Sequence, residues 1–464
     1  MDTRNFPQGF HWGAATASFQ VEGASFEGGR GTSIWDTFCA TPGKVANGDN
    51  GHIACDHFHR FKDDIALMKR MGINTYRFSL AWPRLFPNGD SVAEPRGFEF
   101  YNQLIDALIE AGIEPVATVY HWDMPQALQD RGGWANRDMV DIIADYSRAV
   151  VLAFGDRVKT WITLNEPWVY SWLGYGSGIH APGVADHAQA LAAVHHSALA
   201  HGRMTRTMRE VYSDLKIGIS LNMANVRVTS DDDEHLTHIG ALMDSHNNRF
   251  FMDALTYGHY PQNLVDLYGS ELTRLILPGD SEVMKVETDF VGLNYYSDSF
   301  VNAPTDEDGS LESNPVFRFP GRMNGTPPQP LTAMGWPVTP WGIRDLLNRV
   351  HRDWPQIPEW MITENGAAYT DIPDENGEVH DADRVAYLND HIKNVGLAIS
   401  DGCPVSAYFY WSFMDNFEWA EGYNKRFGIV HVDFETQQRT IKESGFTYAG
   451  IIAEHRESLA TQSA

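Results

Sequence analysis

Two glutamates stand at similar places in this sequence, each at the end of a short apolar run. Glu166 follows "WITLN" and directly precedes Pro167, and Glu364 follows "EWMIT" much later in the chain. A carboxyl group can donate a proton when it is neutral, and it can attack or stabilise a positive centre when it is ionised. Two such groups facing each other could therefore divide these tasks in the cleavage of a bond.

Regular alternation of amphipathic and apolar segments surrounds both glutamates. Residues 58–71 place Phe58, Phe61, Ile65 and Met68 at helical spacing before Gly72 ends the pattern. An apolar run follows at once, and further helices are predicted over 100–112, 137–154 and 186–212. The sequence predicts eight strands, within residues 9–17, 73–82, 113–122, 158–167, 216–224, 289–297, 359–366 and 405–415.

Eight strands separated by helices favour parallel β/α units, and several of the strands are apolar on both faces. We therefore expect an α/β fold, a single (β/α)₈ TIM barrel with long loops at its C-terminal face. One catalytic domain would span residues 1–464, with a core over about 6–450 and a C-terminal tail over 451–464, of which we expect the last dozen residues to be frayed. A doubly wound open sheet is the alternative, but no Gly-rich phosphate turn follows the first strand.

Composition narrows the possible partners. The net charge of −26 argues against nucleic acid and anionic membranes as partners, because both require basic surfaces. Three scattered cysteines favour neither a disulfide framework nor a zinc site, and no apolar segment indicates a signal peptide or membrane helix. We expect a cytoplasmic protein without a cofactor; its oligomeric state is not indicated. The 14 Trp, 18 Tyr and 24 Phe suit core packing first and flat sugar rings second.

Histidine pairs raise a metallohydrolase as an alternative, because a barrel of that kind carries His-x-His at the end of its first strand. The pair His57 and His59 instead starts a predicted helix, and the pairs at 195–196 and 235–238 fall within helices. We therefore predict no metal site. The Pro-, Gly-, Asn- and Asp-rich interval 298–340 is interpreted as a long functional loop between the sixth and seventh strands.

Polar residues close nearly every predicted strand. In a barrel of this type the C-terminal ends of the strands carry the chemistry. Glu166 and Glu364 should therefore face each other across a polar, aromatic-rimmed cleft, which is the arrangement that cleavage of a glycosidic bond requires. The residues at these ends are Gln20, Arg77, His121, Asn165, Glu166, Asn222, Asn294, Tyr296 and Glu364, with Glu418 and Trp419 beyond the eighth strand.

These residues also carry a resemblance to a known family. The sequence resembles the family 1 β-glucosidases of bacteria in motifs that follow the family's order from about Phe6 to Ala449. The resemblance implies a (β/α)₈ barrel and retention of anomeric configuration. The motifs are "FQVEGA" at 19–24, "YHWDMPQAL" at 120–128, "TLNEP" at 163–167, "GLNYYS" at 292–297, "ITENG" at 362–366 and "NFEWAEGYNKRFGIVHVD" at 416–433.

The resemblance implies a role for each site residue. Glu364 would be the nucleophile and Glu166 the acid/base, with Arg77, Asn294 and Tyr296 in support. Asn165 would bond the sugar 2-hydroxyl. Further sugar contacts would come from Gln20, His121, Trp411, Glu418, Trp419 and Phe427, and the leaving-group side from Trp122, Trp168, Leu173, Asn222 and Trp336.

The expected enzyme removes terminal β-glucosyl residues from cello-oligosaccharides and aryl or alkyl β-glucosides by double displacement, with side activity on β-galactosides and β-fucosides and some transglycosylation. Relatives that take 6-phosphorylated glycosides typically replace Glu418 with a smaller residue, so a 6-phospho-β-glycosidase is disfavoured. A non-catalytic sugar-binding barrel is the other alternative, and loss of either Glu166 or Glu364 would have indicated it.

Overall fold

Eight parallel strands close into a barrel in the computed structural model, which describes residues 5–228, 234–301, 316–317 and 327–462. Each strand pairs with its neighbours in parallel, in the order β1-β10-β9-β7-β5-β4-β3-β2 around the barrel. The predicted closed barrel is therefore confirmed, and the open sheet is excluded. The strands are β1 (His11–Ala15), β2 (Thr75–Ser79), β3 (Glu114–Tyr120), β4 (Thr160–Asn165), β5 (Lys216–Asn222), β7 (Phe290–Asn294), β9 (Trp360–Asn365) and β10 (Val405–Trp411).

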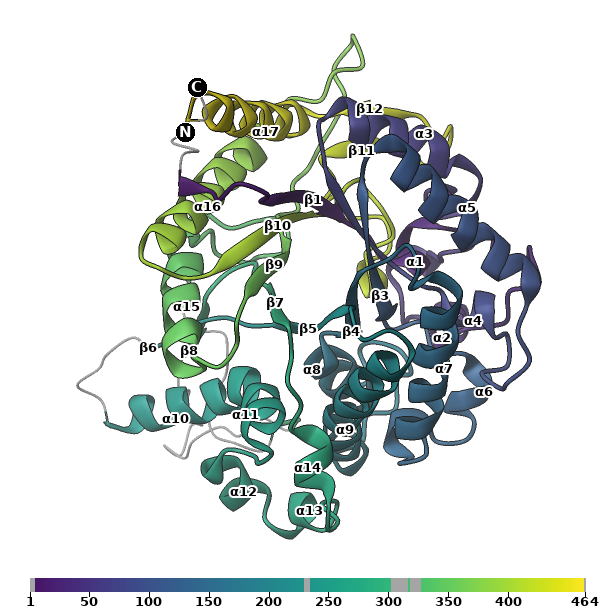
Figure 1. Ribbon diagram of the computed structural model, residues 1–464, viewed down its shortest axis with the longest axis vertical. Helices are drawn as coiled ribbons and strands as arrows, with labels where there is room; N and C mark the ends of the chain where they lie inside the picture. Colours follow the sequence, from purple (N-terminus) through teal and green to yellow (C-terminus); the bar gives the residue numbers. More distant parts are fainter. Residues whose placement is uncertain (1–4, 229–233, 302–315, 318–326, 463–464) are drawn as a thin grey trace.

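Long amphipathic helices surround the barrel (Figure 1). In α3 the side chains of Phe61, Ile65 and Met68 are buried, which follows from their spacing of three and four residues. Helix α5 begins at Pro95 and ends before Gly112, whose positive φ of 76° closes the helix. The long helices are α3 (His57–Arg70), α5 (Pro95–Ala111), α7 (Met139–Phe154), α9 (His187–Val211), α10 (Glu234–Asp244), α11 (Phe250–Tyr257), α15 (Pro340–Asp353), α16 (Ala382–Ser400) and α17 (Glu443–Gln462).

Shorter elements lie in the connections between strands and helices. They include α1 (Ser18–Val21), α2 (Ile34–Ala40), α4 (Trp82–Leu85), α6 (Gln126–Gln129), α8 (Pro167–Val169), α12 (Gln262–Tyr268), α13 (Ser270–Thr273) and α14 (Asp280–Met284). Three are 3₁₀ turns, η2 (Ala46–Gly48), η3 (Gly133–Ala135) and η6 (Trp419–Glu421), and two are π-helical, η4 (Tyr170–Gly176) and η5 (Ser245–Arg249).

Four short strands outside the barrel were not predicted. Strand β6 (Val226–Val228) pairs in parallel with β8 (Ser299–Val301), and β11 (Val430–Val432) pairs with antiparallel β12 (Arg439–Ile441). Each has only three residues, too few to show a two-residue repeat in the sequence. Strand β8 opens the predicted loop over 298–340, of which residues 302–315 and 318–326 lie outside the described residues.

The last dozen residues, which were expected to be frayed, instead continue helix α17 as far as Gln462. Ile451 and Ile452 are buried, and His455 accepts a hydrogen bond from Trp12 Nε1 at 3.0 Å and lies 3.2 Å from the carbonyl of Phe6. These contacts bring the two ends of the chain to the same edge of the barrel, where Figure 1 shows them together. No helix in the described part of the chain is long and apolar enough to cross a membrane.

Candidate active site

A cavity of 420 Å³ opens between the loops at the C-terminal ends of the barrel strands. Both glutamates line it, and both are nearly inaccessible to solvent, with exposed fractions of 6% for Glu166 and 3% for Glu364. The pair predicted from the sequence therefore meets at one site. The other lining residues are His121, Trp122, Val169, Leu173, Ile179, His180, Tyr296, Met334, Trp336, Trp411, Glu418, Trp419, Ala420, Glu421 and Phe427.

The carboxylate of Glu364 accepts hydrogen bonds from the guanidinium of Arg77 and the phenol of Tyr296. Arg77 Nη1 donates to Glu364 Oε1 at 2.7 Å, and the Tyr296 hydroxyl donates to Oε2 at 2.6 Å. Arg77 is itself fully buried and is fixed by further bonds to the Thr363 carbonyl and to Thr118 Oγ1. Burial raises the pKa of Glu364, and the Arg77 guanidinium and the Tyr296 hydroxyl oppose that rise. These donors favour the ionised form of Glu364.

Glu166 has different surroundings. Its Oε1 accepts one hydrogen bond, from Asn294 Nδ2 at 2.8 Å. Burial raises the pKa of Glu166 to about 8, and the negative charge of Glu364 adds to the rise. A carboxyl group with this pKa carries a proton at neutral pH. The two glutamates thus differ in the way that one acid and one anion require.

Asn165 bonds to one neighbour of each glutamate, Arg77 beside Glu364 and Asn294 beside Glu166. Its Oδ1 accepts from Arg77 Nη2 at 2.6 Å and from Asn294 Nδ2 at 3.0 Å. Its Nδ2 lies 3.0 Å from His121 Nε2. Burial and the charge of Arg77 lower the pKa of His121, so the imidazole is neutral. With Nε2 accepting from the amide, Nδ1 carries the hydrogen and remains a donor.

Glu418 is a third carboxyl group in the lining of the cavity. Gln20 Nε2 donates to Glu418 Oε2 at 3.3 Å, to Asn416 Oδ1 at 3.0 Å and to the Phe417 carbonyl at 2.8 Å. Burial and the charge of Glu364 raise the pKa of Glu418 to about 8. Gln20 Oε1 and His121 Nδ1 are buried and have no hydrogen-bond partner among the described residues. Such atoms are suited to bind hydroxyl groups.

Three residues of the cavity have backbone conformations that are rare for residues other than glycine. The φ angles are 77° at Trp122, 47° at Glu166 and 50° at Trp419. Each costs of order 1–3 kcal/mol and persists only where the surroundings impose it. At Trp122 the constraint includes a bond from its Nε1 to the Asn165 carbonyl at 2.8 Å. Such strain often marks functional sites, although six further described residues other than glycine also have positive φ and do not line this cavity.

The protein-family model described as "Glycosyl hydrolase family 1" matches residues 2–457 of this chain. The chain belongs to glycosyl hydrolase family 1.

Two relatives and one solved structure show how much of the chain the similarity covers. Beta-glucosidase A of Thermotoga maritima is 45% identical, over 97% of this chain and 98% of the relative. The 1,4-beta-D-glucan glucohydrolase of Thermotoga neapolitana is also 45% identical, over 97% and 98%. The structure of the beta-glucosidase from Thermotoga maritima in complex with deoxynojirimycin superposes with a TM-score of 0.90 at 44% identity, covering 97% of this chain and 99% of that chain.

Five of the seven residues that were predicted to contact the sugar line the cavity of this family 1 hydrolase. His121, Trp411, Glu418, Trp419 and Phe427 all line the cavity. Gln20 and Asn165 are not among the lining residues, but their side chains bond to Glu418 and His121, which are. Arg77 and Asn294 are buried and do not line this cavity either.

The residues predicted for the leaving-group side divide between two cavities. Trp122 and Leu173 line the 420 Å³ cavity, whereas Trp168 and Asn222 line a neighbouring cavity of 260 Å³. Trp336 lines both, as do Glu166, Val169 and Tyr296. Trp168 is anchored by a bond from its Nε1 to His246 Nδ1 at 3.0 Å. The second cavity therefore begins beside the proton-bearing glutamate.

Other residues of the site were not predicted. Ile179, His180 and Met334 line the main cavity but lie in loops, where no strand end marks them in the sequence. The His57 and His59 pair is engaged with carboxylates, His57 with Asp64 at 2.7 Å and His59 with Asp56 at 2.6 Å. Within the described residues, the one cluster with metal-ligand spacing is exposed, at Asp374, Glu378 and His380, away from the cavity linings.

Proposed function

We propose that this chain is a retaining β-glucosidase in which Glu364 is the nucleophile and Glu166 the acid/base. The observation that carries the proposal is the unequal surroundings of two buried carboxyl groups in one cavity: Arg77 and Tyr296 donate to Glu364, and Asn294 donates to Glu166. A nucleophile must be ionised and an acid must hold its proton before the reaction begins.

The reaction has two displacements. In the first, a Glu364 oxygen bonds to the anomeric carbon while the bond to the leaving oxygen breaks, and Glu166 gives its proton to that oxygen. In the second, Glu166 takes a proton from water, the water oxygen bonds to the anomeric carbon, and the bond to Glu364 breaks. The sugar leaves with its original configuration. A sugar or alcohol in place of water gives transglycosylation.

Retention is supported by the position of Asn294. Its Nδ2 donates to Glu166 Oε1 at 2.8 Å, and its backbone pairs in register with Glu364 between β7 and β9. Two glutamates that neighbour one residue in this way lie near each other, which favours the spacing of about 5 to 5.5 Å found in retaining enzymes. An inverting enzyme needs roughly 6.5 to 9.5 Å to admit a water molecule.

The substrate class is a neutral β-glucoside, including cello-oligosaccharides and aryl glucosides. Trp411, Trp419 and Phe427 offer aromatic faces to the ring, and Glu418 with Gln20 and His121 offers polar atoms to its hydroxyl groups. The buried, negative surroundings that raise the pKa of Glu418 to about 8 oppose a phosphate dianion. Activity on 6-phosphoglucosides is therefore disfavoured, and β-galactosides and β-fucosides are proposed secondary substrates.

One experiment tests substrate class and mechanism together. Nitrophenyl β-glucoside, β-galactoside, β-fucoside and β-glucoside 6-phosphate are compared, and proton NMR follows the first sugar released. We expect the β-glucoside to give the highest kcat/KM and β-glucose to appear before its α-anomer. Cleavage of the phosphorylated substrate in preference to the others would overturn the substrate class, and α-glucose as first product would overturn retention.

A further inference from the structure

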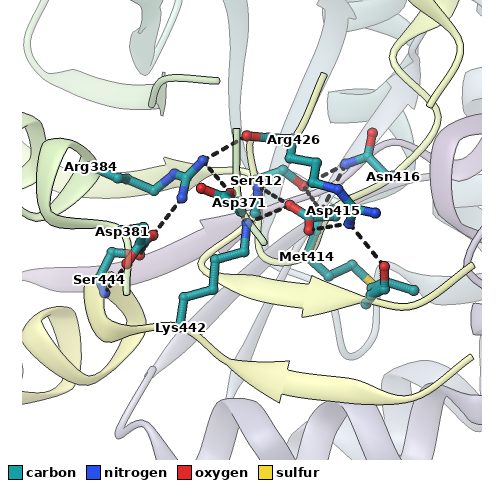
Figure 2. A network of polar contacts seen from close by, with 12 residues as sticks. Asp371, Asp381, Arg384, Ser412, Met414, Asp415, Asn416, Arg426, Lys442 and Ser444 are labelled. Atoms are coloured by element: carbon teal, nitrogen blue, oxygen red, sulfur yellow. Dashed lines mark hydrogen bonds and ion pairs between the residues drawn. The ribbon is translucent and has the colours of Figure 1, made fainter. Parts of the chain in front are cut away.

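A cluster of charged side chains, most of them buried, joins several segments of the chain through ion pairs and hydrogen bonds (Figure 2). It contains three acidic side chains and three basic ones, so its charges balance. They come from the loop after β9, from α16, from the loop after β10, and from the segment between β12 and α17. The members are Asp371, Asp381, Asp415, Arg384, Arg426 and Lys442.

Lys442 bridges two of the acids. Its Nζ donates to Asp371 Oδ2 and, at 2.7 Å, to Asp415 Oδ1. Figure 2 shows the amino group between these two carboxylates. Lys442 and Asp415 have exposed fractions of 0%. A lysine at this depth is maintained only by its paired charges.

Asp415 fixes both ends of a loop. Its Oδ2 accepts from Arg426 Nη1 at 2.7 Å, and its Oδ1 accepts from the Gly428 amide at 3.0 Å. The residue between them, Phe427, lines the cavity, and so do Glu418 and Trp419 within the same loop. One carboxylate thus closes the segment 415–428 at its base.

Asp371 connects this loop to the strand that carries Glu364. It pairs with Arg384 at 2.7 Å, and Arg384 donates to the carbonyl of Arg426 at 2.7 Å and to the carbonyl of Ala367 at 3.2 Å. Ala367 follows Glu364 by three residues. The cluster therefore contacts the backbone next to Phe427 and the backbone three residues after Glu364, and Phe427 and Glu364 both line the cavity.

We propose that Lys442 is a positioning residue for sugar recognition. By bridging Asp371 and Asp415, it holds the loop of Glu418 and Trp419 at a fixed position relative to Glu364. This proposal rests on the proposed function, and it takes Glu418 as a residue that binds the hydroxymethyl group of the glucose. Lys442 does not line either cavity at the site and acts through the loop alone.

Lys442→Met tests the role, because methionine fills much of the same space without a charge. We expect kcat/KM for nitrophenyl β-glucoside to fall about tenfold and that for nitrophenyl β-xyloside to fall less than threefold, because xylose lacks the hydroxymethyl group. The preference for glucoside over xyloside should therefore drop. An equal loss on both substrates, or no loss, would overturn the proposal.

Asp280→Asn is the matched control for buried charge. Asp280 bonds with His195 at 2.9 Å and with Arg137 among the outer helices, away from both cavities at the site. This variant should lower the melting temperature and leave the preference ratio unchanged. If Lys442→Met does not fold, the preference for glucoside over xyloside is measured in Asp371→Asn instead. A threefold drop in this preference supports the proposal, and an unchanged preference overturns it.

Hydrogen exchange gives a readout that does not depend on activity. The Glu418 amide bonds to the Gly422 carbonyl at 2.7 Å, and the Phe417 amide to the Gln20 carbonyl at 3.3 Å. In Lys442→Met, or in Asp371→Asn, residues 415–428 should exchange at least tenfold faster while residues 166–176 are unchanged. Unchanged exchange in 415–428 would overturn the proposal. A wild-type enzyme that fails to cleave the glucoside would instead contradict the proposed function, and the exchange result would still decide the role of Lys442.

Discussion

Glu166 and Glu364 are both buried and line the same cavity, but they have different neighbours. Glu364 receives a guanidinium and a phenol, and Glu166 receives an amide. Glu418 resembles Glu166: its side chain also accepts from an amide, that of Gln20, and its pKa is also raised to about 8. Burial acts on all three carboxyl groups, so the neighbouring donors decide which of them ionises.

The different donors beside the two glutamates indicate which one is the acid and which one the nucleophile, independently of their positions in the sequence. A cation close to a buried carboxylate offsets the loss of water, whereas a neutral amide offsets little of it. Glu364 can therefore be an anion where Glu166 is an acid. Changing one neighbour at a time should shift the pH dependence in a direction that the structure specifies.

Removal of the Glu364 carboxylate should have the largest effect. Glu364→Ala is expected to lower kcat by about 10⁴-fold or more, since the covalent step is lost. Azide should restore part of the rate by attacking the anomeric carbon in its place and should yield the α-glucosyl azide. The matched control is Glu359→Gln, at the opposite end of β9, which should stay within about threefold of wild type. Substantial activity in Glu364→Ala without azide would refute the nucleophile.

Glu166→Gln should give the next largest loss, and one that depends on the leaving group. General acid catalysis contributes about 10² to 10⁴-fold, so alkyl glucosides should lose that much and dinitrophenyl glucosides much less in the first step. Because the pKa of Glu166 is about 8, wild-type activity should fall as pH rises above that value, where Glu166 has no proton to give. The variant should lack this alkaline limb. A limb that stays in place would transfer the acid role to another group.

Arg77→Met should reduce the difference in pKa between the two glutamates. Without the cation the pKa of Glu364 rises, less of it is ionised at a given pH, and the acidic limb of kcat/KM should shift to higher pH. A loss of about 10²-fold at pH 6 is expected from the charged hydrogen bonds removed. Arg77→Lys keeps the charge but loses the bond to Asn165. The acidic limb of kcat/KM in this variant should therefore lie at a pH closer to that of the wild type. A limb that does not shift in Arg77→Met would show that Arg77 does not control the ionisation of Glu364.

The barrel and the glutamate pair could be predicted because their signals are local. All eight barrel strands fall within the predicted apolar runs, and Glu166 and Glu364 stand at strand ends, which a parallel barrel brings to one face. The family motifs also allowed residues beyond the last barrel strand to be predicted, namely Glu418, Trp419 and Phe427. Short elements such as β6 and the π-helical turn after Glu166 have no periodic signal of sufficient length.

Long-range contacts could not be predicted from the same patterns. The bond between Asn294 and Glu166 depends on how β7 and β4 stand around the closed barrel, which no segment of the sequence encodes alone. Lys442 is a further case, because lysine is usually exposed and the carboxylates that bury it lie 27 and 71 positions away in the chain. The frayed tail was wrong for a related reason, since His455 contacts the first strand.

Tyr296→Phe should have the smallest effect and tests the comparison most finely. The variant removes one hydrogen bond to Glu364 Oε2 and leaves Arg77 in place. A single bond from a neutral donor to a charged group contributes about 1.5 kcal/mol, at the lower end of the range for such bonds, so kcat/KM should fall roughly tenfold. The pKa of Glu364 should rise, and the acidic limb should shift to higher pH by less than in Arg77→Met.

The neighbouring tyrosine provides the matched control. Tyr295 is also buried, but its hydroxyl bonds with Asp298 and Thr339, so Tyr295→Phe should leave the acidic limb unchanged. If the two variants shift the limb equally, the effect arises from packing of the loop after β7. If only Tyr296→Phe shifts it, the donor at Oε2 acts on Glu364 itself, and the difference between the two glutamates results from their individual neighbours.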